Sequence, residues 1–191
     1  MVETGIGHTV FLDRDGVINR DSPDYITAWE QFVFLPGSLK AICRLTAAGL
    51  VVMVITNQSA VGRGMMNTAT LEAIHQNLRQ AVEAQGGRIE AVFYCPHHPN
   101  GGCACRKPKP GLILQAQRKY RLDLATATMI GDSARDIECG IRSGCGRTIL
   151  VQSGLHDARA QLDAQGLRPD WVATDLAAAV DWLLARLGST T

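Results

Sequence analysis

Two carboxylates separated by one residue, Asp13 and Asp15, are the first candidates for chemistry in the chain, and Gly16 follows them directly. If the preceding residues form a strand, both carboxylates can face one crevice at its tip. Such a pair can bind a divalent cation while one carboxylate acts as a nucleophile and the other as a general acid. An ordinary Asp-rich turn fits the same residues, so the pair is informative only together with other polar segments.

A second polar segment follows the apolar run at residues 50–55 and combines hydroxyl groups with side-chain amides. Its hydroxyl and backbone N–H groups at a strand end would form a small cradle for an anion, although an ordinary polar turn has the same composition. The residues of this segment are Thr56, Asn57, Gln58 and Ser59.

Two further segments place charges of both signs later in the chain. Lys107, which follows Arg106, precedes a predicted helix and can hold its ammonium group over a phosphate; a solvated basic pair is the alternative. Asp132, Ser133 and Asp136 follow another apolar run. They would add carboxylates to the same region, or would simply cap a helix.

Short apolar runs alternate with segments of helical periodicity along the chain. Runs that are apolar throughout fit strands covered on both faces, as in a parallel sheet, and they occupy residues 9–12, 50–55, 91–94, 127–130, 148–151 and 171–173. Helices are predicted over residues 38–48, 71–82, 110–120 and 175–188. This alternation predicts an α/β fold with a doubly wound, mostly parallel sheet. Because ligands bind at the carboxyl edge of such a sheet, we expect the four polar segments to meet there.

The order and placement of the four segments resemble the motifs of the haloacid dehalogenase superfamily, over residues 9 to about 154. The first motif matches Asp13 and Asp15, the second Thr56, the third Lys107, and the fourth Asp132 with Asp136. The resemblance implies a Rossmann-like fold of the haloacid dehalogenase type. The second aspartate of the first motif resembles the phosphatase branch of the superfamily.

The resemblance also implies a mechanism through an aspartyl-phosphate. Asp13 would be the nucleophile, and Asp15 would protonate the leaving alkoxide and then deprotonate the attacking water. Mg²⁺ would be held by Asp13, the main-chain carbonyl of Asp15, and Asp132. Lys107 and Thr56 would hold the transferring phosphoryl group. Two residues would orient these catalytic groups without reacting themselves: Ser133 and Asp136.

The spacing of the motifs leaves no room for the separate cap domain of larger superfamily members, so we expect an open site whose selectivity comes from loops. The motifs resemble those of capless phosphatases that act on heptose bisphosphates or on histidinol phosphate. Segment 150–154 resembles the corresponding segment of the heptose enzymes, and segment 21–25 favours the same substrate class. The resemblance therefore implies removal of the 7-phosphate of a heptose 1,7-bisphosphate, a step toward lipopolysaccharide core precursors. Histidinol phosphate and a polynucleotide 3′-phosphate are the alternatives. The expected substrate contacts are Arg14, Asp21, Asp24, Asn57, Gln58, Ser59 and Arg106.

Cysteine and histidine cluster in residues 95–105 with the spacing C-x-H-x5-C-x-C. Three thiolates and one imidazole complete a tetrahedral Zn²⁺ site with no open position, so we expect a structural zinc ion within this loop. The ligands would be Cys95, His97, Cys103 and Cys105, with His98 as a competing ligand or a surface residue. The other cysteines and histidines are expected to have no chemical role: Cys43, Cys139, Cys145, His8, His75 and His156.

Composition excludes several classes of protein. The chain has 191 residues, 46% of them hydrophobic, which is enough for a large core and excludes a disordered chain. A formal net charge of +1 gives no broad attraction for nucleic acid or an anionic membrane. The longest apolar run, at residues 47–55, is too short to span a membrane, and no signal peptide is recognisable. We therefore expect one cytoplasmic domain over residues 1–191, a monomer that binds a small phosphorylated sugar.

Overall fold

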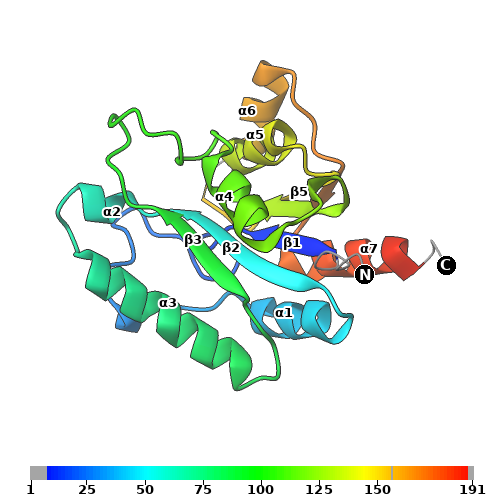
Figure 1. Cartoon of the computed structure of the whole chain (residues 1–191), viewed down its shortest axis with the longest axis horizontal. Helices are drawn as coiled ribbons and strands as arrows, with labels where there is room; N and C mark the ends of the chain where they lie inside the picture. Colours follow the sequence, from blue (N-terminus) through cyan, green and yellow to red (C-terminus); the bar gives the residue numbers. More distant parts are fainter. Residues whose placement is uncertain (1–7, 156, 189–191) are drawn as a thin grey trace.

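The computed structural model describes residues 8–155 and 157–188, and these form a six-stranded parallel sheet (Figure 1). The strand order is β3-β2-β1-β4-β5-β6, with every neighbouring pair parallel. The strands are β1 (Thr9–Leu12), β2 (Val51–Asn57), β3 (Ala91–Cys95), β4 (Thr128–Gly131), β5 (Arg147–Val151) and β6 (Trp171–Ala173). The predicted doubly wound parallel α/β fold is thereby confirmed.

Helices cover both faces of this sheet (Figure 1). They are α1 (Ser38–Ala47), α2 (Ser59–Gly62), α3 (Thr68–Glu83), α4 (Gly111–Tyr120), α5 (Ala134–Ser143), α6 (Ala158–Gln165) and α7 (Leu176–Gly188), with short 3₁₀ turns η1 (Trp29–Gln31) and η2 (Leu124–Thr126). Side chains of β1 alternate between the two layers: Val10 and Leu12 join a core with α1, α3 and α7, whereas Phe11 joins a core with α4 and α5. Burial on both faces explains why Val10, Phe11 and Leu12 are apolar without alternation.

Local sequence signals set the helix boundaries. Asn67 caps α3, because its side chain accepts a hydrogen bond from the Thr70 N–H at 2.8 Å. Asp175 does the same for α7 by accepting from the Ala178 N–H at 2.9 Å. Pro110 lies at the N-cap of α4 rather than inside its first turn. Among the described residues, no helix has the length and apolar character needed to cross a membrane.

The long connection from β1 to α1 is anchored by an aromatic cluster. Trp29 stacks on Phe32 with ring centroids 4.9 Å apart, and Phe34 meets Phe32 edge-on at 5.1 Å. All three rings pack against the core that also holds α1 and α3. The cluster fixes the base of the loop at residues 19–28, whose outer part reaches the site described next.

Candidate active site

The four polar segments meet at the carboxyl edge of the sheet, around a cavity of about 440 Å³. Strands β1, β2 and β4 lie side by side at its floor, so the residues that follow each strand converge there. The sequence-predicted residues that line the cavity are Asp13, Asp15, Asp21, Thr56, Asn57, Gln58, Ser59, Arg106, Lys107, Asp132, Ser133 and Asp136. Residues more than a hundred positions apart in the chain are thus brought to one site.

A buried lysine joins two carboxylates at the centre of the site. Lys107 Nζ lies 2.9 Å from Asp13 Oδ2 and 2.6 Å from Asp136 Oδ1, and it donates to the Ile55 carbonyl at 2.8 Å. These three partners match the three donors of an ammonium group. Burial acts to lower the pKa of Lys107, but the two carboxylates outweigh it and raise the pKa above its usual range. The lysine therefore remains charged within the site.

The second carboxylate centre, Asp132, is enclosed by backbone. Gly16 and Gly154 approach it so closely that a Cβ atom on either glycine would overlap the Asp132 carboxylate. Burial, together with the charges of Asp136 and Asp13, raises the pKa of Asp132 to about 9. Burial likewise raises the pKa of Asp13 to about 7, although Lys107 opposes the shift. The raised pKa values of these two crowded carboxylates indicate that the site has too little positive charge to keep both ionised.

A divalent cation fits this charge imbalance. Oxygen atoms of Asp13, Asp132 and Asp136 lie within 4.8 Å of one another, and carboxylate oxygens are the ligands that Mg²⁺ prefers. Asp136 already uses both oxygens, because Oδ1 contacts Lys107 and Oδ2 accepts from the Ser133 N–H and Oγ. Asp13 also has a partner at each oxygen, but its side chain is 14% exposed whereas that of Asp136 is fully buried. Asp13 and Asp132 are therefore the carboxylates that an ion in the cavity can reach.

Asp15 lies in a separate network of hydrogen bonds. The Arg14 guanidinium donates to both of its oxygens, while Asn19 donates to Oδ1 and Gln58 to Oδ2, each at 2.8 Å. Burial acts to raise the pKa of Asp15, but these donors outweigh it and hold the pKa below its usual value. The neighbouring acids Asp13 and Asp15 therefore have opposite pKa shifts.

Two expected substrate contacts lie elsewhere. Arg14 is fully buried and pairs with Asp15 beneath the cavity, so it is not among the residues that line the cavity. Asp24 is also absent from the cavity lining, although Asp21 is present. The Asp24 N–H donates to the Ser22 hydroxyl at 3.2 Å. Asn57 lines the cavity but also holds the backbone of Lys107, by accepting from its N–H at 3.0 Å and donating to its carbonyl at 3.2 Å.

Eight of the described lining residues were not predicted as site residues, and four of them change the charge or the apolar character of the cavity. Arg63 and Arg135 add positive charge to the cavity, and Leu155 adds an apolar group. Tyr25 has a left-handed backbone (φ 65°), uncommon for a residue with a side chain, and its ring lies 5.8 Å from the Arg63 guanidinium carbon. Three of the four belong to segments outside the four motifs, where no local sequence pattern indicates which side chains reach the cavity.

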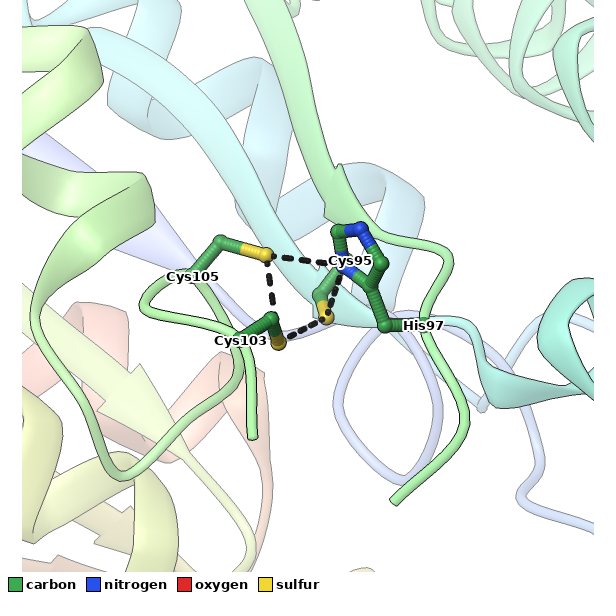
Figure 2. Close-up of side chains that lie close together, drawn as sticks. All are labelled: Cys95, His97, Cys103 and Cys105. Atoms are coloured by element: carbon green, nitrogen blue, oxygen red, sulfur yellow. Dashed lines mark hydrogen bonds between the residues drawn. The ribbon is translucent and has the colours of Figure 1, made fainter. Parts of the chain in front are cut away.

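The Cys/His loop brings its four predicted ligands together (Figure 2). Cys103 Sγ lies 3.5 Å from the sulfurs of Cys95 and Cys105, and His97 Nδ1 lies 3.2 Å from Cys105 Sγ and 3.5 Å from Cys95 Sγ. Thiolates bound to one zinc ion at about 2.3 Å would be about 3.8 Å apart, so the donor set and its spacing fit a tetrahedral zinc ion. His98 is outside this group and accepts from the Asn100 N–H at 3.3 Å. Lys109 also holds the loop by donating to the Cys103 carbonyl at 2.7 Å.

We predict that purified protein carries about one zinc ion per chain and that Cys103→Ser lowers both zinc content and thermal stability. The reason is that a closed tetrahedral site contributes binding free energy directly to folding. Elemental analysis together with thermal unfolding checks this, with Cys43→Ser as the matched control because Cys43 lies outside the loop. Zinc-free protein with unchanged unfolding would contradict the zinc site.

The fold and the site define a phosphatase of the haloacid dehalogenase (HAD) class, a phosphoric monoester hydrolase. The HAD-hydrolase-like family model matches residues 104–179. A D-glycero-β-D-manno-heptose-1,7-bisphosphate 7-phosphatase of Bordetella bronchiseptica is 46% identical over 177 residues, which cover 92% of this chain and 97% of that protein. The chain belongs to the D-glycero-D-manno-heptose-1,7-bisphosphate 7-phosphatase family.

Other relatives agree with this membership. The enzyme of the same name from Pseudomonas aeruginosa is 46% identical over 76% of this chain and 81% of its own. A D-glycero-α-D-manno-heptose-1,7-bisphosphate 7-phosphatase of Mycobacterium bovis is 38% identical over 86% of this chain and 90% of its own. The crystal structure of the B. bronchiseptica D,D-heptose 1,7-bisphosphate phosphatase with magnesium and phosphate superposes with a TM-score of 0.87, at 44% identity, over 94% of this chain and 99% of that one.

Proposed function

We propose that this enzyme removes the 7-phosphate of D-glycero-D-manno-heptose 1,7-bisphosphate through an aspartyl-phosphate on Asp13. The observation that carries the proposal is the ion pair of Asp13 with buried Lys107, 2.9 Å apart, at the floor of an arginine-lined cavity. A carboxylate can approach a phosphate dianion only where positive charge offsets the repulsion of the two anions. The named activity of relatives at 46% identity supports the same substrate.

In the first half-reaction, a carboxylate oxygen of Asp13 forms a bond to phosphorus while the bond from phosphorus to the sugar oxygen breaks. Asp15 gives its proton to the departing alkoxide, which leaves as heptose 1-phosphate. The donors around Asp15 hold it ionised in the free enzyme, so it takes up this proton as the phosphate binds, because a phosphate anion beside the carboxylate favours its neutral form. The same donors then favour release of the proton to the alkoxide. Thr56, 1% exposed at the end of β2, and Lys107 would hold the transferring oxygens.

In the second half-reaction, water attacks the phosphorus of the aspartyl-phosphate and the bond to Asp13 breaks. Asp15, ionised after the first half, takes the proton of that water, and inorganic phosphate leaves. Asp13, the main-chain carbonyl of Asp15, and Asp132 would hold Mg²⁺ in this site. When bound, Mg²⁺ supplies positive charge against the phosphoryl oxygens.

A substrate panel tests the proposed specificity. We expect kcat/KM for the heptose 1,7-bisphosphate to exceed those for histidinol phosphate, fructose 1,6-bisphosphate and a 3′-phosphorylated oligonucleotide by at least about tenfold. Both anomers of the heptose belong in the panel because relatives named for each anomer match the chain. A higher value for histidinol phosphate would replace the proposed substrate with that alternative.

Arg106 is expected to bind the phosphate that does not react. Its side chain lines the cavity, and its Nη1 is buried without a hydrogen-bond partner among the described residues. A guanidinium nitrogen without a partner can donate a hydrogen bond to an oxygen of the substrate. Arg106→Ala should therefore raise KM for the bisphosphate by roughly 10–100-fold, as for a lost hydrogen bond between charged groups, with little change in kcat.

Steady-state kinetics on a sugar bisphosphate and a sugar monophosphate checks this role. Arg118→Ala is the matched control, since it removes the same charge from the exposed side of α4. If Arg106→Ala raised KM equally for both substrates, Arg106 would bind the phosphate that reacts instead.

We also propose that residues 1–191 act as one cytoplasmic phosphatase domain that contains the loop 95–105. The predicted catalytic residues of one chain all line the same cavity, so the proposed site needs no residue of a second copy, and we propose that the protein acts as a monomer. The net charge of +1 supports a small phosphorylated sugar, rather than nucleic acid or a membrane, as the partner. Sedimentation at working concentrations, which should give a mass near 20.6 kDa, tests the oligomeric state.

A further inference from the structure

A buried histidine contacts the back of the Arg14–Asp15 pair. His75 lies on the inner face of α3 with 5% of its surface exposed, and its Nε2 is 3.2 Å from Arg14 Nη1. The other two guanidinium nitrogens, Nε and Nη2, both point at the Asp15 carboxylate, at 2.9–3.1 Å. The three residues thus form one line from α3 to the cavity.

The direction of the hydrogen bond follows from chemistry. A guanidinium only donates hydrogen bonds, so Nε2 of His75 must accept, and the ring must be neutral with its proton on Nδ1. Burial, followed by the Arg14 charge, lowers the pKa of His75 to about 3, which agrees with a neutral ring. The contact geometry and the lowered pKa thus agree that His75 accepts a hydrogen bond from Arg14.

The remaining contacts leave Arg14 little freedom. Its guanidinium carbon lies 5.8 Å from the centre of the Phe32 ring, and its side chain is fully buried. The ring of Tyr94 lies 5.5 Å from that of His75 on the side of β3. Without an acceptor at His75, one edge of the guanidinium would be buried without a hydrogen-bond partner, which favours rotation away from Asp15.

We propose that His75 is a positioning residue of the phosphatase reaction: by holding Arg14, it orients the Asp15 carboxylate toward the leaving oxygen. This inference rests on the proposed role of Asp15 as the acid that protonates the leaving alkoxide. It assigns a function to a histidine that is not among the residues lining the cavity. It also accounts for the burial of a charged arginine beneath the cavity.

Two substrates with different leaving groups test the proposal. A sugar alkoxide needs a proton to leave, whereas the phenolate of 4-nitrophenyl phosphate leaves without one. His75→Leu, which keeps the volume but removes the acceptor, should lower kcat/KM about tenfold for the sugar phosphate and less than about twofold for the aryl phosphate. Because kcat/KM covers only the steps up to the first irreversible one, later hydrolysis of the phosphoenzyme does not affect the comparison.

His75→Gln and Leu78→Ala are the matched variants. Glutamine places an acceptor oxygen near the position of Nε2, so His75→Gln should restore most of the sugar phosphate activity. Leu78 is buried on the same face of α3, so Leu78→Ala weakens the packing of this helix against the core without removing the acceptor. Equal losses on both substrates in His75→Leu, or the same pattern in Leu78→Ala, would overturn the proposal in favour of a structural role.

Asp15→Asn separates this proposal from the one on which it rests. If Asp15→Asn lowers kcat/KM equally for both substrates, Asp15 is not the acid, and the proposed role of His75 is excluded as well. If Asp15→Asn discriminates between the substrates and His75→Leu does not, only the role of His75 is overturned. In the Asp15→Asn background, His75→Leu should cause no further loss on the sugar phosphate, because both variants act on one carboxylate.

Discussion

Replacing Asp13 with Asn is expected to lower phosphate release by more than about 10⁴-fold, as when a covalent nucleophile is removed. The amide is nearly isosteric with the carboxylate but a poor nucleophile toward phosphorus. The fold should be retained, because Asp13 Oδ1 accepts from the Arg14 N–H at 2.7 Å and an amide oxygen can keep that bond.

Rapid quenching with labelled substrate is the direct measurement. Wild-type enzyme should retain an acid-stable, hydroxylamine-sensitive label on Asp13, whereas Asp13→Asn should retain none. Asp163→Asn is the matched control, since it removes one negative charge from the exposed surface of α6. A variant that releases phosphate within tenfold of the wild-type rate would exclude the covalent mechanism.

The strands and most of the longer helices could be predicted because their signals are local. Strands β1 and β2 contain the continuous buried apolar runs 10–12 and 52–55, as burial on both faces requires, and α3 repeats Leu71, Ile74 and Leu78 on one buried face. Helix α2 has only four residues, too few for a periodic pattern, and α6 has a weak one. Helix α5 was anticipated only as the capping alternative for the segment that starts at Asp132, and the structure has both the cap and the acidic cluster.

The sequence predicts which residues meet at the site where those residues lie at the ends of strands. Asp13, Thr56 and Asp132 converge because parallel strands end at one edge, a rule that needs no side-chain detail. Lys107 follows the Cys/His loop instead, and the resemblance to the superfamily motif predicted its place. Arg14 was misplaced, although the alternation of side chains already puts the residue between two inward carboxylates on the opposite side. His75 was assigned no role because its partner lies 61 positions away, and no local pattern reveals such a contact. His156 lies outside the described residues.

Removing the ammonium group of Lys107 should have the second largest effect. Lys107→Met is expected to lower kcat by about 10²–10³-fold on every phosphate ester, because a fixed positive charge beside the reacting group is lost. It should also destabilise the fold by about 3–5 kcal/mol, the usual cost of leaving buried charges without a partner. Both effects follow from its contacts to Asp13 and Asp136, at 2.9 and 2.6 Å.

A second substitution separates the two effects. Asp136 is fully buried and contributes one of the two charges that Lys107 neutralises, so Lys107→Met with Asp136→Asn removes one charge of each sign. The double variant should recover part of the free energy of unfolding, measured in urea, but not the turnover, because no ammonium group then lies beside Asp13. If turnover returned together with stability, the role of Lys107 would be to balance buried charge, and the phosphoryl group would have to be neutralised by other groups in the cavity.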